Sequence, residues 1–154
     1  MKQRIYIDTS VIGGCLDPEF SKWSKLLFEK FKAGVMSAVV SDLTRQELEL
    51  APPRVRKLLD DLPDASIENV FLGEGARELA DDYIAGDIVA LKDIADAQHI
   101  AIATVEGVDM LVSWNFHHVV NIDLIRGFNS VNLRLGYKLL EIRRPREVVH
   151  EKGI

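Results

Sequence analysis

The chain has few of the features that mark secreted or membrane proteins. Its 154 residues include one cysteine, Cys15, which excludes an internal disulfide and is typical of a reducing compartment. No stretch approaches the roughly 18 consecutive apolar residues of a membrane-spanning helix. The first residues, MKQRIYIDTS, hold too short an apolar segment for a signal peptide. We therefore expect a soluble, cytoplasmic protein with no membrane contact.

The chain also has fewer basic residues than acidic ones. The chain has 19 lysines and arginines against 24 aspartates and glutamates, which gives a formal net charge of −5. Nucleic acid would therefore have to be attracted by a local basic patch or by bound metal ions. Two basic clusters could contact RNA, one formed by Arg54, Arg56 and Lys57 and the other by Arg143, Arg144 and Arg146. For either cluster alone, a solvated surface or salt bridges are the commoner role.

Short apolar stretches alternate with longer amphipathic ones, and we expect residues 1–154 to form a single domain. Strands are predicted at 4–8, 35–40, 110–113 and 138–142, with weaker strand signals at 66–72 and 119–124. Helices are predicted at 11–16, 19–32, 43–50, 55–62, 74–85 and 94–105. This order predicts an α/β protein with three layers, in which a mostly parallel sheet of about four to five strands lies between helices on both faces.

The stretch from Lys92 to Asn115 places acidic residues at the start of a buried element. Residues 94–105 are apolar on nearly every face, which is typical of a buried helix. Asp93 and Asp96 lie at the start of that helix, and the strand that follows it leads to Asn115. Ligands of open α/β sheets bind at the carboxyl ends of the strands, so these polar residues are candidates for a site.

Two more acids occupy corresponding places in the predicted sheet. Asp8 ends the first strand, and Glu47 lies in the helix that follows the second. Because the carboxyl ends of parallel strands share one edge, we expect these acids to lie near Asp96. An oxygen-rich cluster with few histidines suits Mg²⁺ or Mn²⁺ better than zinc. Such cations bind substrate phosphates and support the hydrolysis of phosphodiester bonds.

Each acid also has a structural alternative. Thr44-x-x-Glu47 matches a capping box, so Glu47 could simply stabilise a helix start. Asp93 could be an N-cap with Asp96 at the third position, and Asp8 could cap the helix that follows it. For each acid alone the structural alternative is the commoner one. Their shared position on one predicted sheet edge favours the functional interpretation.

Four segments that combine polar and apolar residues follow one another along the chain: IDTSVIGG, SDLTRQELE, DIADAQHIAIAT and LVSWNFHHVVN. In this order and spacing they resemble the PIN domain family, and most closely its small VapC-type proteins. The resemblance covers essentially the whole chain. It implies a metal-dependent ribonuclease, a hydrolase that cuts RNA, and the toxin of a toxin–antitoxin pair that is silenced by an antitoxin peptide or protein. A homodimer is also expected.

The resemblance assigns roles to the acidic residues. It maps the metal ligands and catalytic acids of the family onto Asp8, Glu47 and Asp96, with Mg²⁺ or Mn²⁺ as the cofactor. It leaves Asp93 as the helix cap. Auxiliary or substrate-contacting roles are expected for Thr9, Ser10, Ser113 and Asp93.

The fourth position departs from the family, because PIN proteins often carry an aspartate where this chain has Asn115. The asparagine carbonyl can still bind a cation, but it brings no charge. We therefore expect one firm metal site and a second that depends on substrate phosphate, with Asn115 assisting or orienting the attacking water. The alternative is a catalytically weak or inactive PIN module that binds RNA or protein. A structure-specific DNA nuclease is more distant, since it would need a longer chain and more acids.

Histidines and aromatic residues have more ordinary interpretations. The pattern Asp96-x-x-His99, together with His117 and His118, could indicate a histidine-rich metal site. A hydrogen-bonded core histidine at position 99 and a solvated pair at 117 and 118 are commoner. Core positions, or failing that a homodimer interface, are expected for Phe20, Trp23 and Phe31.

Overall fold

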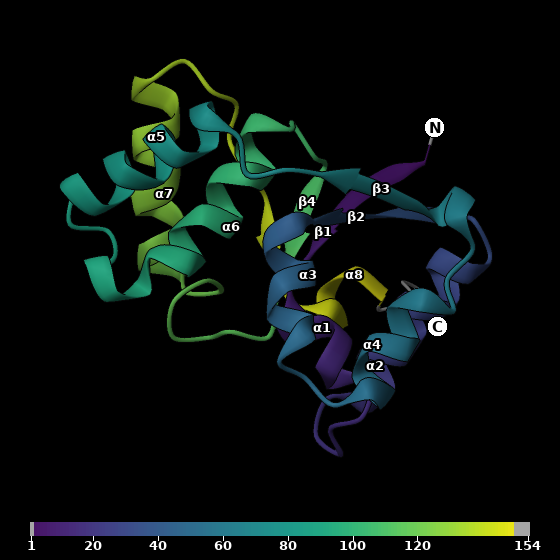
Figure 1. The fold of residues 1–154 in the computed structure, drawn as a ribbon. Coiled ribbons are helices and arrows are strands. Elements are labelled where there is room, and N and C mark those ends of the chain that lie inside the picture. The colour runs from purple at the N-terminus through teal and green to yellow at the C-terminus, as the bar shows by residue number, and fades with distance from the viewer. Residues whose placement is uncertain (1, 150–154) are drawn as a thin grey trace.

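The computed structural model describes residues 2–149, which fold around one five-stranded sheet (Figure 1). Its strands are β1 (Gln3–Ile7), β2 (Met36–Ser41), β3 (Ile67–Val70), β4 (Met110–Val112) and β5 (Ile142–Arg143). Their order in space is β3-β2-β1-β4-β5, and every neighbouring pair is parallel. The predicted parallel sheet is therefore confirmed, with β1 at its centre.

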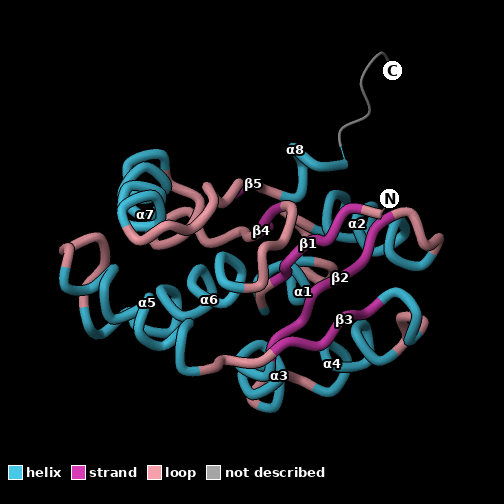
Figure 2. Tube along the Cα trace, turned by 90° about the horizontal axis from the view of Figure 1, so that it is seen from above, coloured by secondary structure: helices cyan, strands magenta, loops and turns pink. Residues whose placement is uncertain are grey.

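Helices cover both faces of this sheet. They are α1 (Thr9–Gly14), α2 (Ser21–Lys32), α3 (Asp42–Glu49), α4 (Pro53–Asp60), α5 (Glu74–Ala85), α6 (Ile94–Val105), α7 (Ile122–Arg134) and α8 (Pro145–Val149). In Figure 1, α5, α6 and α7 gather on one side of the strands, and α1, α2, α4 and α8 gather on the other. Figure 2 shows the same separation from above.

The alternation of side chains along β1 builds the two cores. Tyr6 points into the cluster that α5, α6 and α7 supply, whereas Ile5 and Ile7 point into the cluster beneath α1, α2 and α4. All three side chains are fully buried. Strands that are buried on both faces appear in the sequence as continuous apolar runs, which is why β1 could be recognised from its sequence.

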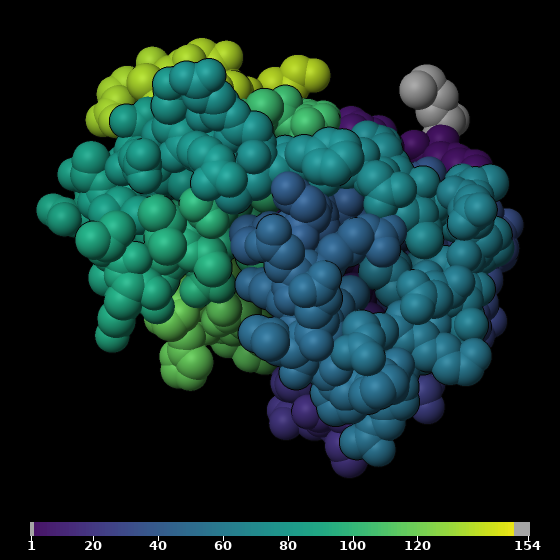
Figure 3. All heavy atoms as spheres, viewed as in Figure 1, coloured from purple at the N-terminus to yellow at the C-terminus, as the bar shows by residue number. Residues whose placement is uncertain are grey.

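Helix α3 lies between the two helical layers. Its Leu43 packs against the core on the α6 side, and its Leu48 belongs to the opposite core. In the space-filling view the surface of α3 separates that of α4 from that of α5 and α6 (Figure 3). A residue on α3 can therefore approach both α1 and α6.

The main errors of the sequence prediction concern its last two strand signals. Of residues 138–142, only Ile142 lies in a strand, β5. In place of the weak strand signal at 119–124, the structure has a turn and then the start of α7 at Ile122. Asn121 is the N-cap, and its side-chain oxygen accepts hydrogen bonds from the backbone nitrogens of Asp123 (3.0 Å) and Leu124 (3.3 Å). The aliphatic residues of this stretch favoured a strand, but the cap and the apolar face of α7 decided for a helix.

The ends of the buried helix agree with the sequence prediction. Helix α6 spans Ile94–Val105, and most of its residues from Ala97 onward are buried. Gly107 follows with φ of 63°, a left-handed conformation that glycine adopts without strain. Within residues 2–149, none of the helices is long and apolar enough to cross a membrane.

Candidate active site

Asp8 follows β1 directly and caps α1. Its Oδ1 accepts hydrogen bonds from the backbone nitrogen of Val11 (3.3 Å) and from Ser10 Oγ (2.5 Å). Its Oδ2 accepts one from Ser113 Oγ at 2.6 Å, at the end of β4. The structural and the functional interpretations of Asp8 are thus compatible, since one carboxylate caps a helix and also lies at the edge of the sheet.

Glu47 is not part of a capping box. Helix α3 begins one turn earlier than that interpretation requires, because Ser41 is its N-cap and accepts a hydrogen bond from the backbone nitrogen of Thr44 (3.1 Å). Glu47 therefore lies late in the helix. Its Oε1 accepts hydrogen bonds from Thr9 Oγ1 (2.7 Å) and His99 Nε2 (2.9 Å). The structural alternative for Glu47 is wrong.

Asp96 lies in the first turn of α6. Its Oδ1 accepts a hydrogen bond from Asn115 Nδ2 at 3.3 Å, and its Oδ2 lies 3.2 Å from His118 Nδ1. Burial raises the pKa of Asp96 and the nearby charges of Asp8 and Asp93 add to this, while His118 and His99 oppose it. Asp93 occupies the N-cap position of α6, but its side chain makes no capping hydrogen bond, so that part of the cap prediction is wrong.

Asn115 organises the loop after β4. Its Oδ1 accepts a hydrogen bond from the backbone nitrogen of His118 at 3.0 Å, and its backbone oxygen accepts from Val119 and Val120. This turn brings the His118 ring to Asp96 and, at 3.7 Å, to Asp93 Oδ2. The His118 side chain remains 42% exposed, as expected of a solvated loop, but the asparagine side chain folds the loop back so that the ring also contacts the two acids. His117 is exposed.

Four predicted site residues thus meet at the carboxyl edge of the sheet. We call this set the acidic edge: Asp8, Glu47, Asp96 and Asn115. Among the auxiliary residues, Ser10 and Ser113 hold the carboxylate of Asp8, and Thr9 holds that of Glu47.

The donor chemistry of the acidic edge fits a hard divalent cation, since its side chains offer carboxylate and amide oxygens. The side chains are not closed around one point, however. Among residues 2–149, the group of three whose ligand atoms lie within 4.8 Å of one another is Asp93, Asp96 and His118. Oxygens bound to one Mg²⁺ at 2.0–2.1 Å lie at most about 4.2 Å apart. A cation bound directly by Asp8, Glu47 and Asp96 would therefore draw these side chains together.

Two histidines near the acids were underestimated by the sequence reasoning. His99 is buried, as expected of a core histidine, but its ring also contacts Glu47. The spacing of three residues between Asp96 and His99 was the available signal, because it places both on one face of a helix. His118 had no comparable signal, since its place depends on the turn at Asn115.

The basic clusters are engaged mostly with the protein itself. Arg56 donates to the backbone oxygen of Ala51 at 2.7 Å, and Lys57 pairs with Asp61. Arg143 and Arg144 pair with Glu147, and Arg143 also pairs with Glu141. The Arg146 guanidinium lies over the ring of Trp23. These contacts favour the structural interpretation of both clusters.

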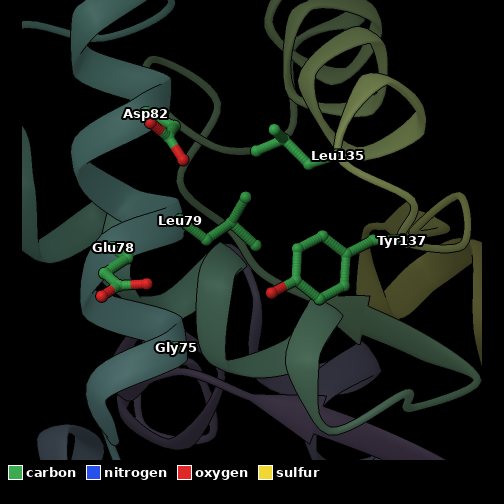
Figure 4. Close-up of a pocket in the computed structure, with 6 residues that line it drawn as sticks. All are labelled: Gly75, Glu78, Leu79, Asp82, Leu135 and Tyr137. Carbon is green, nitrogen blue, oxygen red and sulfur yellow. The ribbon is translucent and has the colours of Figure 1, made fainter.

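One pocket lies away from the acidic edge, between α5 and the segment that follows α7 (Figure 4). Its lining residues are Gly75, Glu78, Leu79, Asp82, Leu135 and Tyr137. None of them is a candidate site residue. The chemistry expected from the sequence is therefore not located in this pocket.

Comparisons with known proteins identify the fold. No protein-family model and no curated protein matches the sequence. The structure resembles VapBC2 from Rickettsia felis bound to a DNA fragment from its promoter, with a TM-score of 0.57 and 12% identity over 92% of this chain and 98% of that one. It also resembles FitAcB from Neisseria gonorrhoeae, with a TM-score of 0.57 and 14% identity over 92% and 97% of the two chains. The chain has a PIN-like fold. At these identities the likeness concerns the fold alone.

Proposed function

We propose that this protein is a Mg²⁺- or Mn²⁺-dependent endoribonuclease of the PIN type. The observation that carries the proposal is the acidic edge, where three acids from separate segments lie beyond the carboxyl ends of the strands of a PIN-like sheet and Asn115 donates a hydrogen bond to one of them, Asp96. Asp96 gives the strongest support for a cation site, because burial and two neighbouring acids oppose its ionisation. A divalent cation would compensate this unfavourable charge. A cluster with only a structural role would gain nothing from an uncompensated carboxylate at this position.

Asp8, Glu47 and Asp96 would hold the cation. When bound, such a cation makes a water molecule more acidic and stabilises the charge that develops on a phosphodiester. The protein residues supply orientation: Ser10 and Ser113 fix Asp8, and Thr9 fixes Glu47. Each of these hydroxyls donates to a carboxylate oxygen and so fixes the orientation of that carboxylate.

Asn115 would limit the charge of the site. Its amide nitrogen donates to Asp96, whereas an aspartate there would repel it. Three carboxylates are enough for one divalent cation, and a second would depend on the phosphate of the substrate. His118, beside Asp96, adds an imidazole nitrogen to the surroundings of the site, and such a ligand suits Mn²⁺ better than Mg²⁺.

The biological role that we propose is the toxin of a toxin–antitoxin pair. The two structures named above are toxin–antitoxin complexes, and the sequence segments resemble VapC-type proteins. The partner would then be an antitoxin whose binding silences the acidic edge.

The proposal predicts that Asp8→Asn and Asp96→Asn reduce cleavage of single-stranded RNA in Mn²⁺ by roughly 10²–10³-fold, because each removes a negative charge that would hold the cation, and the cation would stabilise the charge developing on the phosphate. Cleavage is measured on labelled RNA with and without EDTA. Asp81→Asn, an exposed acid on α5, is the matched control and should cleave at the wild-type rate. Undiminished cleavage by either edge variant would contradict the mechanism.

The second candidate function is a PIN module that binds RNA or protein without cutting. The neutral Asn115 favours it, because the edge carries one acid fewer than many PIN proteins have. Titration of the wild-type protein with Mn²⁺ separates the two functions. Absence of binding at millimolar Mn²⁺, with RNA bound but intact, would favour the inactive module.

A further inference from the structure

The contacts of His99 extend beyond those of an ordinary core residue. It lies on α6, is 4% exposed, and contacts a polar group with each ring nitrogen. Its Nε2 is 2.9 Å from Glu47 Oε1, and its Nδ1 is 2.7 Å from Tyr6 Oη. The ring therefore joins α3 to β1 through α6.

The chemistry of Glu47 indicates which atom donates in its contact with His99. Burial opposes the ionisation of Glu47, but hydrogen bonds from His99 and Thr9 outweigh it, so the pKa of Glu47 lies below its ordinary value. An ionised carboxylate can only accept, so His99 Nε2 carries a hydrogen. Burial raises the pKa of Tyr6 far above its ordinary value, which keeps its hydroxyl hydrogen in place. The hydroxyl contacts both Nδ1 and Ser41 Oγ, and so it holds the ring in place whichever of the two accepts its hydrogen.

The hydrogen bonds form a chain that starts at the N-cap of α3 and ends at Glu47 in the same helix. The Tyr6 oxygen also lies 2.7 Å from Ser41 Oγ, and Ser41 is the N-cap of α3. Ser41, Tyr6, His99 and Glu47 thus form a continuous chain through β2, β1, α6 and α3. The first three are buried, so water does not compete for these hydrogen bonds.

Both protein hydrogen bonds to Glu47 go to the same oxygen. Thr9 and His99 each donate to Oε1, and among residues 2–149 no hydrogen bond is made to Oε2. A carboxylate held at one oxygen has a fixed orientation and leaves its other oxygen available. Oε2 is therefore the atom of Glu47 that a cation would use.

We propose that His99 is a positioning residue for Glu47. Its ring, oriented by Tyr6, holds the carboxylate at Oε1 and keeps Oε2 accessible at the acidic edge. This inference rests on the proposed metal-dependent function. A histidine that only filled space in the core would have no bearing on metal affinity.

The first measurement is made without metal. A ¹H–¹⁵N correlation spectrum of the histidine rings at pH 7 should show a hydrogen on His99 Nε2 that exchanges slowly with water, and Tyr6→Phe should speed this exchange, because it removes the contact that holds the ring. Tyr83→Phe is the matched control, because it removes another buried tyrosine hydroxyl on the same side of the sheet, which bonds to Asn132. A His99 ring without hydrogen on Nε2 in the wild-type protein would overturn the proposal.

The second measurement is Mn²⁺ affinity, followed by calorimetry. Loss of a residue that orients a ligand typically costs 10–100-fold in metal affinity, so we expect His99→Leu to weaken binding by at least about tenfold. His99→Gln, which keeps a donor for Glu47, should recover part of the loss, and Tyr83→Phe should bind as wild type. Wild-type affinity in a folded His99→Leu protein would overturn the inference and leave the proposed function standing. No Mn²⁺ binding by the wild-type protein would instead overturn the proposed function, while the spectrum would still decide whether His99 Nε2 carries its hydrogen.

Discussion

Replacing Gly14 by alanine should destabilise the protein, although the same change at Gly13 should not. Both glycines lie in α1, where alanine is the better helix former by about 0.5–1 kcal/mol. A Cβ at position 14 would lie 2.6 Å from Ser24 Oγ and 2.8 Å from Trp114 Nε1, closer than real Cβ atoms come to other groups. At position 13 nothing lies within 4 Å.

The atoms that face Gly14 cannot move aside at low cost. Ser24 is fully buried and donates to the backbone oxygen of Val11 at 2.8 Å. The same hydroxyl accepts a hydrogen bond from Trp114 Nε1 at 2.9 Å. Overpacking typically costs about 1–3 kcal/mol, and a lost hydrogen bond adds about 0.5–1.5 kcal/mol. After the gain in helix propensity, we expect Gly14→Ala to lower the free energy of unfolding by about 1–3 kcal/mol.

Urea denaturation of the wild type and of both variants measures this difference. Gly13→Ala should be neutral or more stable by up to about 1 kcal/mol, and a loss of 1 kcal/mol corresponds to a fall in Tm of roughly 2–4 °C. Equal stability of the two variants would refute the packing argument. Gly14→Ala should also impair the acidic edge, because α1 follows Asp8 and Trp114 precedes Asn115 in the chain.

Two further predictions concern charge at the acidic edge. The raised pKa of Asp96 means that its ionised form is unfavourable in the metal-free fold, so its contribution to stability is fullest below the unfolded pKa of about 3.9 and is lost as pH rises through the folded pKa. Asp96→Asn should therefore raise the Tm of the metal-free protein at pH 7, with no advantage near pH 3; a lower Tm at pH 7 would contradict this. Asn115→Asp places a second carboxylate against Asp96 and should lower the free energy of unfolding without metal by roughly 1–4 kcal/mol, while calorimetry shows tighter Mn²⁺ binding. Unchanged stability and affinity would show that the two side chains do not share a site.

Local sequence patterns were sufficient for most of the fold. The apolar runs of β1 and β2 and the nearly uniform apolarity of α6 indicate buried elements whatever lies around them. Glycine at position 107 ends α6 for a reason that involves only its own backbone. The stretch at 119–124 was misread because its aliphatic residues suit a strand as well as a helix, and the N-cap at Asn121 was overlooked.

The place of the acids followed from the sequence as well, since the carboxyl ends of parallel strands must share an edge. Their hydrogen-bond partners did not follow. Tyr6 and His99 are 93 positions apart, and Ser113 and Asp8 are 105 positions apart. Such pairs leave no local pattern in one sequence.

The sequence by itself determined that this chain forms a parallel sheet with Asp8, Glu47 and Asp96 at one edge. Apolar periodicity is a local property that identifies the strands and helices, and the carboxyl ends of parallel strands share one edge. Only the tertiary structure decided that Glu47 is held by His99 rather than serving as a cap, and that Asn115 turns His118 toward Asp96. These outcomes depend on where whole elements pack against one another. A buried polar group must then take the partner that the packing brings to it, because leaving it unpaired costs more than any local preference.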